Sequence, residues 1–342
     1  MIDWLREIGR GKRGIRSLTY TEAANAAAGI LDGKATPAQT AAFLTAQKLK
    51  QETTEEIIAF IDSLRKRSRL HPVEGSIDCA GPFCSRGHSF LATLPTAFVL
   101  AACRQPVTLH STPSAPPHAA SALVGVVAAL GIAVDAVPQD RWIAAADRSC
   151  FLFVPTERWC PSLSGIRAVR EEIGIRTLFD TAEELLRPSD APYMAIGIPS
   201  GSGSEKAADL LSRLGVQRAL IVQSAEGSED VPVDRRTRVV VLRDEVSDIH
   251  IIDPHTFGLH AVVPAPPASG WTAGAQAQTT LDVLAGRAAP AYRNAVLLNS
   301  AMRLWIADRT DTIEEGIEHA KSALDNGLAW KHYTKWREKL EA

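Results

Sequence analysis

The stretch "LTYTEAANAAAGILDGKATPAQTAAFLTAQKLKQETTEEIIAFIDSLRKRS", residues 18–68, decides the fold of the first part of the chain. Three helix-start signals divide it: Thr19 with Glu22, Thr36 with Pro37, and Thr53 or Thr54. A Thr that precedes an acid by three residues, or a Pro by one, is typical of a helix N-terminus. Apolar residues recur at helical spacing between these signals, so each helix has one face to bury. The stretch predicts a small helical module.

From about residue 75 the pattern changes to short apolar runs separated by helical stretches. The runs are "SIDCAG", "QPVTLHS", "CFLFVP", "YMAIGIP", "RALIVQS" and "TRVVVL". Strands that are apolar on both faces are typical of a sheet covered by helices on both sides. We expect an α/β fold in which a small N-terminal helical domain (residues 1–72) joins a larger domain (residues 73–342) with a mostly parallel central sheet flanked by helices.

A helical segment near residues 160–188 is expected to join the first domain in space. Because parallel sheets bind ligands at the carboxyl ends of their strands, we expect a cleft between the two domains.

The composition limits which cellular compartment and which classes of binding partner we expect. The five cysteines are scattered singly, with no Cys/His spacing of a zinc site, which favours a reducing cytoplasm. The N-terminus lacks the apolar core of a secretory signal, and prolines interrupt the uncharged stretches between residues 87 and 134, so no membrane association is expected. The net charge of −2 gives no overall attraction to nucleic acid.

Two short runs of basic residues differ from this near-neutral overall charge. Their candidate phosphate-binding residues are Arg10, Lys12, Arg13 and Arg16 in the first run, and Arg65, Lys66 and Arg67 in the second. Lys and Arg that contact phosphates displace counterions without reading sequence. Cations in the last turn of a helix also interact favourably with the negative end of its dipole. The alternative interpretation is therefore that these residues lie at solvated helix ends and bind no ligand.

Three separated blocks of sequence resemble one known family. They are residues 18–57, "VREEIGIRTLFD" (169–180) and "YRNAVLLNSAMRLWIAD" (292–308). In this order they are similar to the anthranilate phosphoribosyltransferase family, of the nucleoside-phosphorylase-like class. The resemblance implies the two-domain fold described above and, in its enzymes, transfer from phosphoribosyl pyrophosphate.

The motifs that carry this chemistry in the family are changed here. Its "GTGGD" phosphate loop falls on "GPFCS", Gly81 to Ser85, and its "KHGNR" motif falls on "LHSTP", residues 109–113. Only Gly81 and His110 are kept, so backbone donors and both cations are lost. The family's Asp-Glu magnesium pair corresponds to Glu229 and Asp230 in swapped order.

A residual ligand cleft is still expected. Its candidate residues are Gly81, Ser85, Arg86, His88, His110, Thr112 and Arg170, the last of which matches the family's anthranilate-side arginine. No cofactor is expected, and Mg²⁺ only if a phosphoribosyl substrate is bound, with Glu229 and Asp230 as its ligands. No catalytic residue is assigned.

"LREIGRGKRGIRSLTYTEA" (5–23) and "CPSLSGIRAVREEIGIRT" (160–177) are similar to the YbiB-like branch of this fold. That resemblance implies a homodimer joined through the helical modules, without phosphoribosyl transfer, which binds DNA or RNA non-specifically. The alternatives are a pentosyl or phosphoribosyl transferase with an altered substrate, anthranilate phosphoribosyltransferase itself, and a small-molecule sensor.

Overall fold

The N-terminal helices begin at the predicted caps. The computed structural model describes residues 1–9, 16–80, 87–113, 122–201 and 203–341. Its first helices are α1 (Ile2–Ile8), α2 (Tyr20–Leu31), α3 (Pro37–Lys50) and α4 (Thr54–Arg65). The side chains of Thr19, Thr36 and Thr53 each accept a hydrogen bond from the backbone N–H three residues later. Each also belongs to a capping box, which satisfies two donors at the helix start.

The described residues of the second domain contain one seven-stranded sheet in the order β3-β2-β1-β4-β5-β6-β7. Its strands are β1 (Ile77–Ala80), β2 (Val107–Ser111), β3 (Phe151–Pro155), β4 (Tyr193–Pro199), β5 (Arg218–Ser224), β6 (Thr237–Arg243) and β7 (Val246–Ile252). The pairs from β3 to β5 are parallel, and β6 and β7 are antiparallel to their neighbours. Together with the helical module this confirms the predicted fold class.

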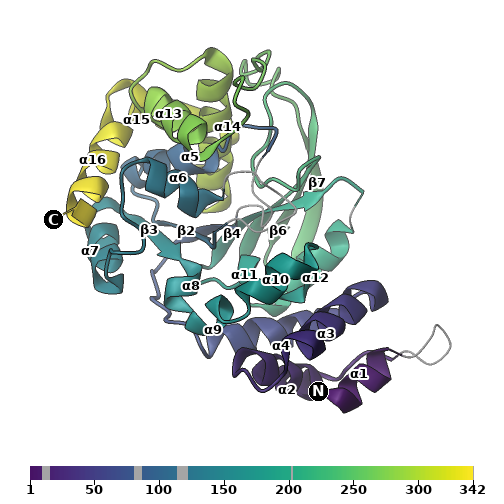
Figure 1. Cartoon of the computed structure of the whole chain (residues 1–342). Helices are drawn as coiled ribbons and strands as arrows, with labels where there is room; N and C mark the ends of the chain where they lie inside the picture. The colour runs from purple at the N-terminus through teal and green to yellow at the C-terminus, as the bar shows by residue number, and fades with distance from the viewer. Residues whose placement is uncertain (10–15, 81–86, 114–121, 202, 342) are drawn as a thin grey trace.

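Helices cover both faces of the sheet. They are α5 (Thr93–Ala102), α6 (Leu123–Ala129), α7 (Gln139–Ser149), α8 (Thr156–Trp159), α9 (Pro161–Ser164), α10 (Arg167–Ile173), α11 (Leu178–Glu184), α12 (Ser204–Arg213), α13 (Ala273–Leu284), α14 (Pro290–Ile306), α15 (Ile313–Asp325) and α16 (Leu328–Glu341). In Figure 1 the module α1–α4 lies at one end of the molecule and α13–α16 at the opposite end, with the sheet between them.

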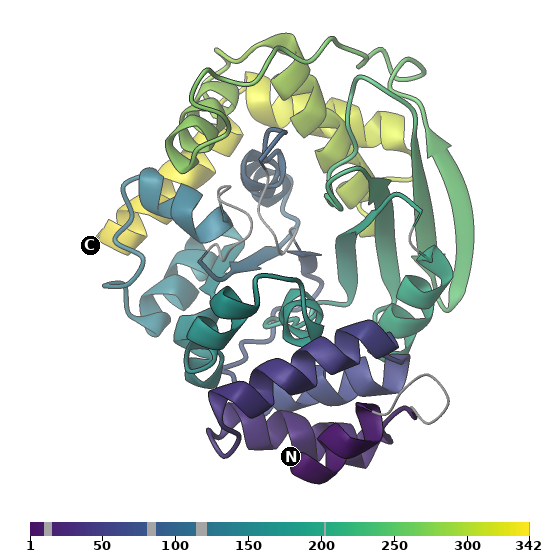
Figure 2. The same cartoon turned by 45° about the vertical axis from the view of Figure 1, so that its right-hand side comes forward.

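Alternating residues of the strands pack into two separate hydrophobic cores. On β5, Leu220 and Val222 pack into a core with α5 and α14, whereas Ala219 and Ile221 pack into a core with α2–α4 and α12. This alternation follows from the twofold repeat of a strand. The second core also holds Cys160, Leu163 and Phe179, so residues of the mid-chain segment pack with the helical module (Figure 2).

The sequence did not predict β7. Val246, Ile249 and Ile251 are all more than half exposed, because β7 is the edge strand and pairs only with β6. Its sequence "VSDIHII" mixes polar and apolar residues without the buried pattern that identified the central strands. No helix within the described ranges is both long and apolar enough to cross a membrane.

Candidate functional site

A small cavity of about 40 Å³ lies beyond the carboxyl end of β2. Its lining comes from β2 and the residue after it, the starts of α5 and α6, the end of α11 and the loop after β5: Leu91, Thr93, His110, Ser111, Thr112, Ala122, Leu123, Glu183, Glu184 and Glu229. The ionisable lining residues are three glutamates and one histidine. No Lys or Arg of the described chain lines this cavity.

His110 is held beside a buried carboxylate of the neighbouring strand. Its Nε2 lies 3.4 Å from Oδ1 of Asp78 in β1, and both side chains are buried. Burial alone lowers the pKa of His110, but the charges of Asp78, Glu183 and Glu184 outweigh it, so the pKa lies above its usual value. The cavity therefore favours a protonated imidazole.

The two glutamates at the end of α11 take arginine partners from outside the cavity lining. Arg170 on α10 donates through Nη2 to Oε2 of Glu183 at 2.8 Å, and Arg176 pairs with Glu184. Oε1 of Glu184 is buried without a hydrogen-bond partner in the described chain. Burial raises the pKa of Glu184, because its charged form is poorly solvated there.

Glu229 and Asp230 lie in the loop after β5 and are linked to α5 and α14. Asp230 accepts the backbone N–H of Thr93 at 3.0 Å and Nη2 of Arg303 at 2.9 Å, and the Thr93 hydroxyl bonds to Glu229. These contacts use both carboxylate oxygens of Asp230 and Oε1 of Glu229. No three potential metal ligands of the described chain come together. Glu229 and Asp230 as magnesium ligands of a bound phosphoribosyl substrate stay a prediction.

Sequence comparison places this geometry in a family. Residues 85–330 match the family described as "Glycosyl transferase family, a/b domain", and residues 2–68 match "Glycosyl transferase family, helical bundle domain". Anthranilate phosphoribosyltransferase of Brevibacillus brevis is 33% identical over 92% of both chains. That of Symbiobacterium thermophilum is 33% identical over 98% of this chain and 96% of its own. The chain belongs to the anthranilate phosphoribosyltransferase-like family.

Solved structures show the same fold. Anthranilate phosphoribosyltransferase of Thermus thermophilus superposes with a TM-score of 0.83 at 24% identity, covering 96% of this chain and 97% of that one. The enzyme of Saccharomyces cerevisiae in complex with PRPP and Mg gives 0.81 at 16% identity, covering 99% and 97%. The fold assignment is thus independent of the changed motifs.

The predicted cleft residues do not all meet in this member of the family. His110 and Thr112 line the small cavity. Arg170 lies behind it, buried against Asp180 and Glu183. His88 lies elsewhere, where its backbone N–H donates to Oε1 of Glu226 at 2.9 Å. Gly81, Ser85 and Arg86 lie outside the described residues.

The basic residues predicted to bind nucleic acid differ in their partners. Arg10, Lys12 and Arg13 lie outside the described residues. Arg16 binds Glu22 at 2.7 Å and Glu7 at 3.1 Å. Arg65 donates to the carbonyls of Leu186 and Arg187 and pairs with Asp190, and Arg67 pairs with Asp32 at 2.8 Å. Lys66 is exposed and makes no ion pair within the described ranges.

Sequence reasoning missed four residues of the cavity and its surroundings. Asp78, Glu183, Glu184 and Arg303 are all buried. Two of them left a signal: Asp78 interrupts the apolar run "SIDCAG", and Arg303 is the only charge in "AVLLNSAMRLWIA". A charge inside a buried element needs a partner of opposite charge or a hydrogen-bonding network, so such positions point to a polar site.

Proposed function

We propose that this member of the family does not transfer a phosphoribosyl group to anthranilate and instead binds nucleic acid non-specifically as a homodimer. The observation that carries the first half is the charge of the cavity at the end of β2, which Glu183, Glu184 and Glu229 line without a Lys or Arg of the described chain. A pyrophosphate needs cations and backbone N–H donors to replace its water.

Arg170 cannot supply that compensation where it stands. Its side chain is 6% exposed, and its guanidinium already faces Asp180 and Glu183. To bind an outside carboxylate it would have to leave two buried acids uncompensated, which costs several kcal/mol. The family's arginine is therefore present in the sequence, but Asp180 and Glu183 already neutralise its charge.

The nucleic-acid half of the proposal rests on the basic residues of the two runs. Lys66 is exposed and makes no ion pair within the described ranges, and Arg10, Lys12 and Arg13 supply a run of cations close in sequence. Arg16, Arg65 and Arg67 would have to exchange carboxylate partners for phosphates. We assign the main contacts to Arg10, Lys12, Arg13 and Lys66, because each cation that contacts a phosphate releases counterions from the nucleic acid.

Exposed apolar side chains on the helical module support the homodimer. Leu49 near the end of α3 is 81% exposed, and Ile2 at the start of α1 is 54% exposed. The two helices pack against each other. Covering large apolar side chains in a dimer removes them from water, which is the main driving force of such interfaces.

Salt-dependent oligonucleotide binding tests the proposal. We expect fluorescence anisotropy with single- and double-stranded oligonucleotides to show affinity that falls steeply with salt. Lys12→Ala with Arg13→Ala should reduce the salt slope by about two. Lys331→Ala with Lys335→Ala on α16 is the matched control, because it removes the same charge from exposed positions away from the helical module. Unchanged binding in the first double variant, or no binding at low salt, contradicts the proposal.

A second candidate function is group transfer to or from a different substrate in the small cavity. The observation that favours it is Oε1 of Glu184, which is buried, lines the cavity and has no hydrogen-bond partner in the described chain. A neutral or cationic donor group could satisfy it, whereas a phosphate could not.

The relatives are named anthranilate phosphoribosyltransferases, so that activity is the direct alternative. Loss of anthranilate fluorescence in the presence of phosphoribosyl pyrophosphate and Mg²⁺ measures it. Turnover at the rate of an active relative assayed in parallel would overturn the first half of our proposal. No turnover together with a flat calorimetric titration of phosphoribosyl pyrophosphate supports it.

A further inference from the structure

The strand β7 forms the outer edge of the sheet, because it pairs with β6 on one side only. Figure 1 shows it at the margin of the sheet away from β3. Edge strands present unpaired backbone N–H and C=O groups, and proteins usually protect them with Pro, Lys, a bulge or a covering segment. The sequence of β7, "VSDIHII", contains no Pro, Lys or Arg, and its pairing with β6 is continuous from Val246 to Ile252. This edge is therefore open to another strand.

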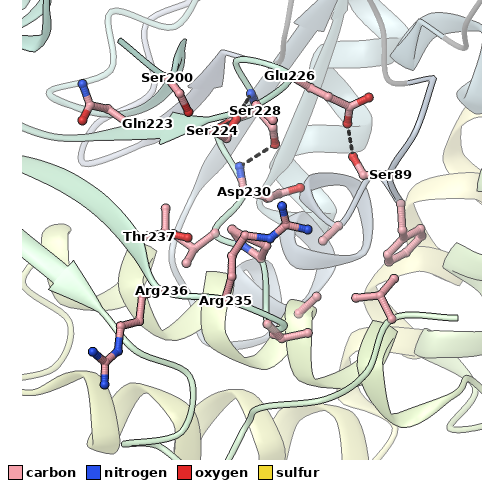
Figure 3. Close-up of a pocket in the computed structure, with 18 of the residues that line it drawn as sticks. Ser89, Ser200, Gln223, Ser224, Glu226, Ser228, Asp230, Arg235, Arg236 and Thr237 are labelled. Carbon is pink, nitrogen blue, oxygen red and sulfur yellow. Dashed lines mark hydrogen bonds between the residues drawn. The ribbon is translucent and has the colours of Figure 1, made fainter. Parts of the chain in front are cut away.

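A cavity of about 420 Å³ lies near the start of β6, but it does not reach β7. Arg236 and Thr237 line it together with residues of β5 and α14 (Figure 3). No residue of β7 is among the described residues of its lining. The outer edge of β7 is therefore a separate surface, and no described segment of the chain pairs with it.

The hairpin turn between β6 and β7 decides which backbone groups face outward. Asp244 and Glu245 have positive φ angles of 47° and 71°, as a two-residue type I′ turn requires. The residues that flank such a turn form a hydrogen-bonded pair, and every second pair along the ladder is hydrogen-bonded. The residues of β7 that direct their backbone groups to β6 are therefore Val246, Asp248, His250 and Ile252. Those that direct them to the free edge are Ser247, Ile249 and Ile251.

An added strand must pair with these three outward-facing residues. When β7 pairs antiparallel with its own copy, they must therefore meet the same three residues of that copy. One register places Ile249 opposite Ile249 of the second copy and brings every residue of β7 into a pair. Its hydrogen-bonded pairs exchange about six backbone hydrogen bonds. Other registers that match the outward-facing residues shift the strands along each other and leave the ends of both unpaired.

Charges on β7 favour the fully paired register. Directly opposite residues lie on the same face of a sheet, with Cβ atoms about 4.5–5.5 Å apart. The fully paired register places Asp248 opposite His250 of the second copy, twice by symmetry, so a carboxylate meets an imidazole in each pair. A shift toward the turn places Asp248 opposite Asp248, where like charges repel, and a shift the other way places it opposite Ile252. The edge is thus complementary to itself, and the partner it fits is a second copy of this chain.

Exposed apolar side chains on β7 supply a driving force. Ile249 and Ile251 are 59% and 61% exposed. They lie on the face of β7 opposite to His250, whose ring packs edge-on against Trp305 of α14. The fully paired register brings Ile249 against Ile249 of the second copy, with Ile251 of each copy diagonal to it. These side chains then leave water, which favours association.

We propose that two copies of the chain associate through their β7 strands, which pair antiparallel about a twofold axis at Ile249 and join the two sheets into one. This interface uses no residue of the helical module, so it goes beyond the proposed homodimer through α1 and α3 and does not depend on it. A chain that carries two self-complementary interfaces assembles beyond a dimer.

Disulfide trapping of the full-length chain tests the register. Asp248→Cys with His250→Cys places each new thiol opposite its counterpart in the second copy. The Cα separation is about 4.5 Å, as in other non-hydrogen-bonded pairs, and a disulfide spans it. We expect mild oxidation to convert most of this variant to a covalent dimer, seen on a non-reducing gel and removed by a reducing agent.

Asp248→Cys alone is the control for the register. It should not cross-link through β7, because the two Cα atoms at this position lie diagonally, about 7–8 Å apart. Wild type oxidised in parallel shows the background from the cysteines that the chain already has.

Sedimentation velocity over a range of protein concentrations measures the association itself. Leu49→Glu adds a charge to the exposed surface of the helical module, and this variant should still form a species of twice the monomer mass through β7. Adding Ile249→Lys should remove that species, because two ammonium groups then face each other across the edge. Adding Val262→Lys instead is the matched control, since Val262 is 86% exposed and lies in the segment after β7.

The two proposed interfaces fail in different ways. The β7 interface is overturned if the double cysteine variant cross-links no more than Asp248→Cys alone, or if Leu49→Glu by itself abolishes all association. It is also overturned if Ile249→Lys leaves the same mass as Val262→Lys. Association that Leu49→Glu does not change and Ile249→Lys abolishes supports the β7 interface and contradicts only the homodimer through the helical module.

Discussion

Arg303 on α14 donates through Nη2 to Oδ1 of Asp230 at 2.9 Å, and the two side chains are 1% and 6% exposed. This pair joins the longest C-terminal helix to the loop after β5, which carries Glu229 of the small cavity. Arg303 also donates to the Thr93 hydroxyl at 3.0 Å, so α5, α14 and the loop after β5 meet at one buried cation. This charge therefore holds the loop after β5 in place.

Asp230→Ala is expected to lower the free energy of unfolding by about 3–5 kcal/mol, because it leaves the buried guanidinium without its carboxylate. Urea denaturation measures this. Asp282→Ala is the matched control: Asp282 pairs with Arg287 at 3.2 Å on the surface, where an ion pair contributes about 1 kcal/mol or less. Equal effects of the two substitutions would show that the Arg303–Asp230 pair does not hold the loop after β5.

Gly197 on β4 is the second element that positions this loop. A Cβ at Gly197 would meet the carbonyl oxygen of Gly227 at 2.0 Å and the backbone nitrogen of Glu229 at 2.5 Å. Gly197→Ala must therefore displace the loop that carries Glu229 and Asp230. We expect a loss of about 3 kcal/mol in the free energy of unfolding, measured by urea denaturation.

The control for Gly197→Ala is Gly29→Ala. Gly29 lies inside α2, and a Cβ there would meet nothing within 4 Å. Alanine is the better helix former, so this substitution is expected to stabilise the protein by up to about 1 kcal/mol. If Gly197→Ala proves as harmless as Gly29→Ala, the close approach of β4 and the loop has no structural importance.

How far the sequence predicted the fold depends on how local each signal is. Thr19 and Thr53 fix their helix starts through residues three positions away, so the caps could be predicted. The central strands could be predicted because they are buried on both faces. The strand β7 could not, because an edge strand with exposed apolar residues carries no such pattern.

The candidate site was less predictable for a related reason. Asp78, Glu183, Glu229 and Arg303 lie on elements far apart in sequence, and only the fold brings them together. The sequence showed that the family's cations are missing from residues 109–113, but not that acids occupy the lining instead. The acids line the cavity because α11 ends close to the end of β2, and no local sequence pattern predicts that proximity.

Glu56 offers a test of what burial adds to a capping box. Its carboxylate is fully buried and accepts the backbone N–H groups of Leu18 at 2.8 Å and Thr53 at 2.9 Å, and the ammonium of Lys50 at 2.6 Å. Glu56→Ala leaves a cation that is only 4% exposed without its partner. We expect a loss of about 3–5 kcal/mol, measured by urea denaturation.

Glu22 fills the same position in the capping box of α2 but lies near the surface, with its side chain 29% exposed. Glu22→Ala removes the same cap contact and an ion pair with Arg16, and about 1 kcal/mol is expected. The ratio of the two losses measures the contribution of burial. A loss at Glu56 no greater than that at Glu22 would show that Lys50 finds water or another partner in the variant.

The pH dependence of unfolding tests the charge state of His110. Burial opposes protonation, but Asp78 at 3.4 Å, with Glu183 and Glu184 nearby, raises the pKa of His110 above its ordinary value of about 6.5. A pKa raised by folding means that the folded state binds the proton more tightly. This contribution to stability is fully present below about pH 6.5 and is lost as the pH rises through the folded-state pKa.

Urea unfolding of wild type and His110→Gln between pH 5.5 and 9 measures this contribution of His110 to the free energy of unfolding. We expect the stability difference between them to shrink as the pH rises, because wild type loses the favourable charge on His110 and the variant has none to lose. Asp78→Asn should flatten the dependence, since it removes the nearest carboxylate. His319→Gln, an exposed position on α15, controls for the substitution itself. A difference that stays constant, or grows toward high pH, would mean that the cavity does not favour the protonated imidazole.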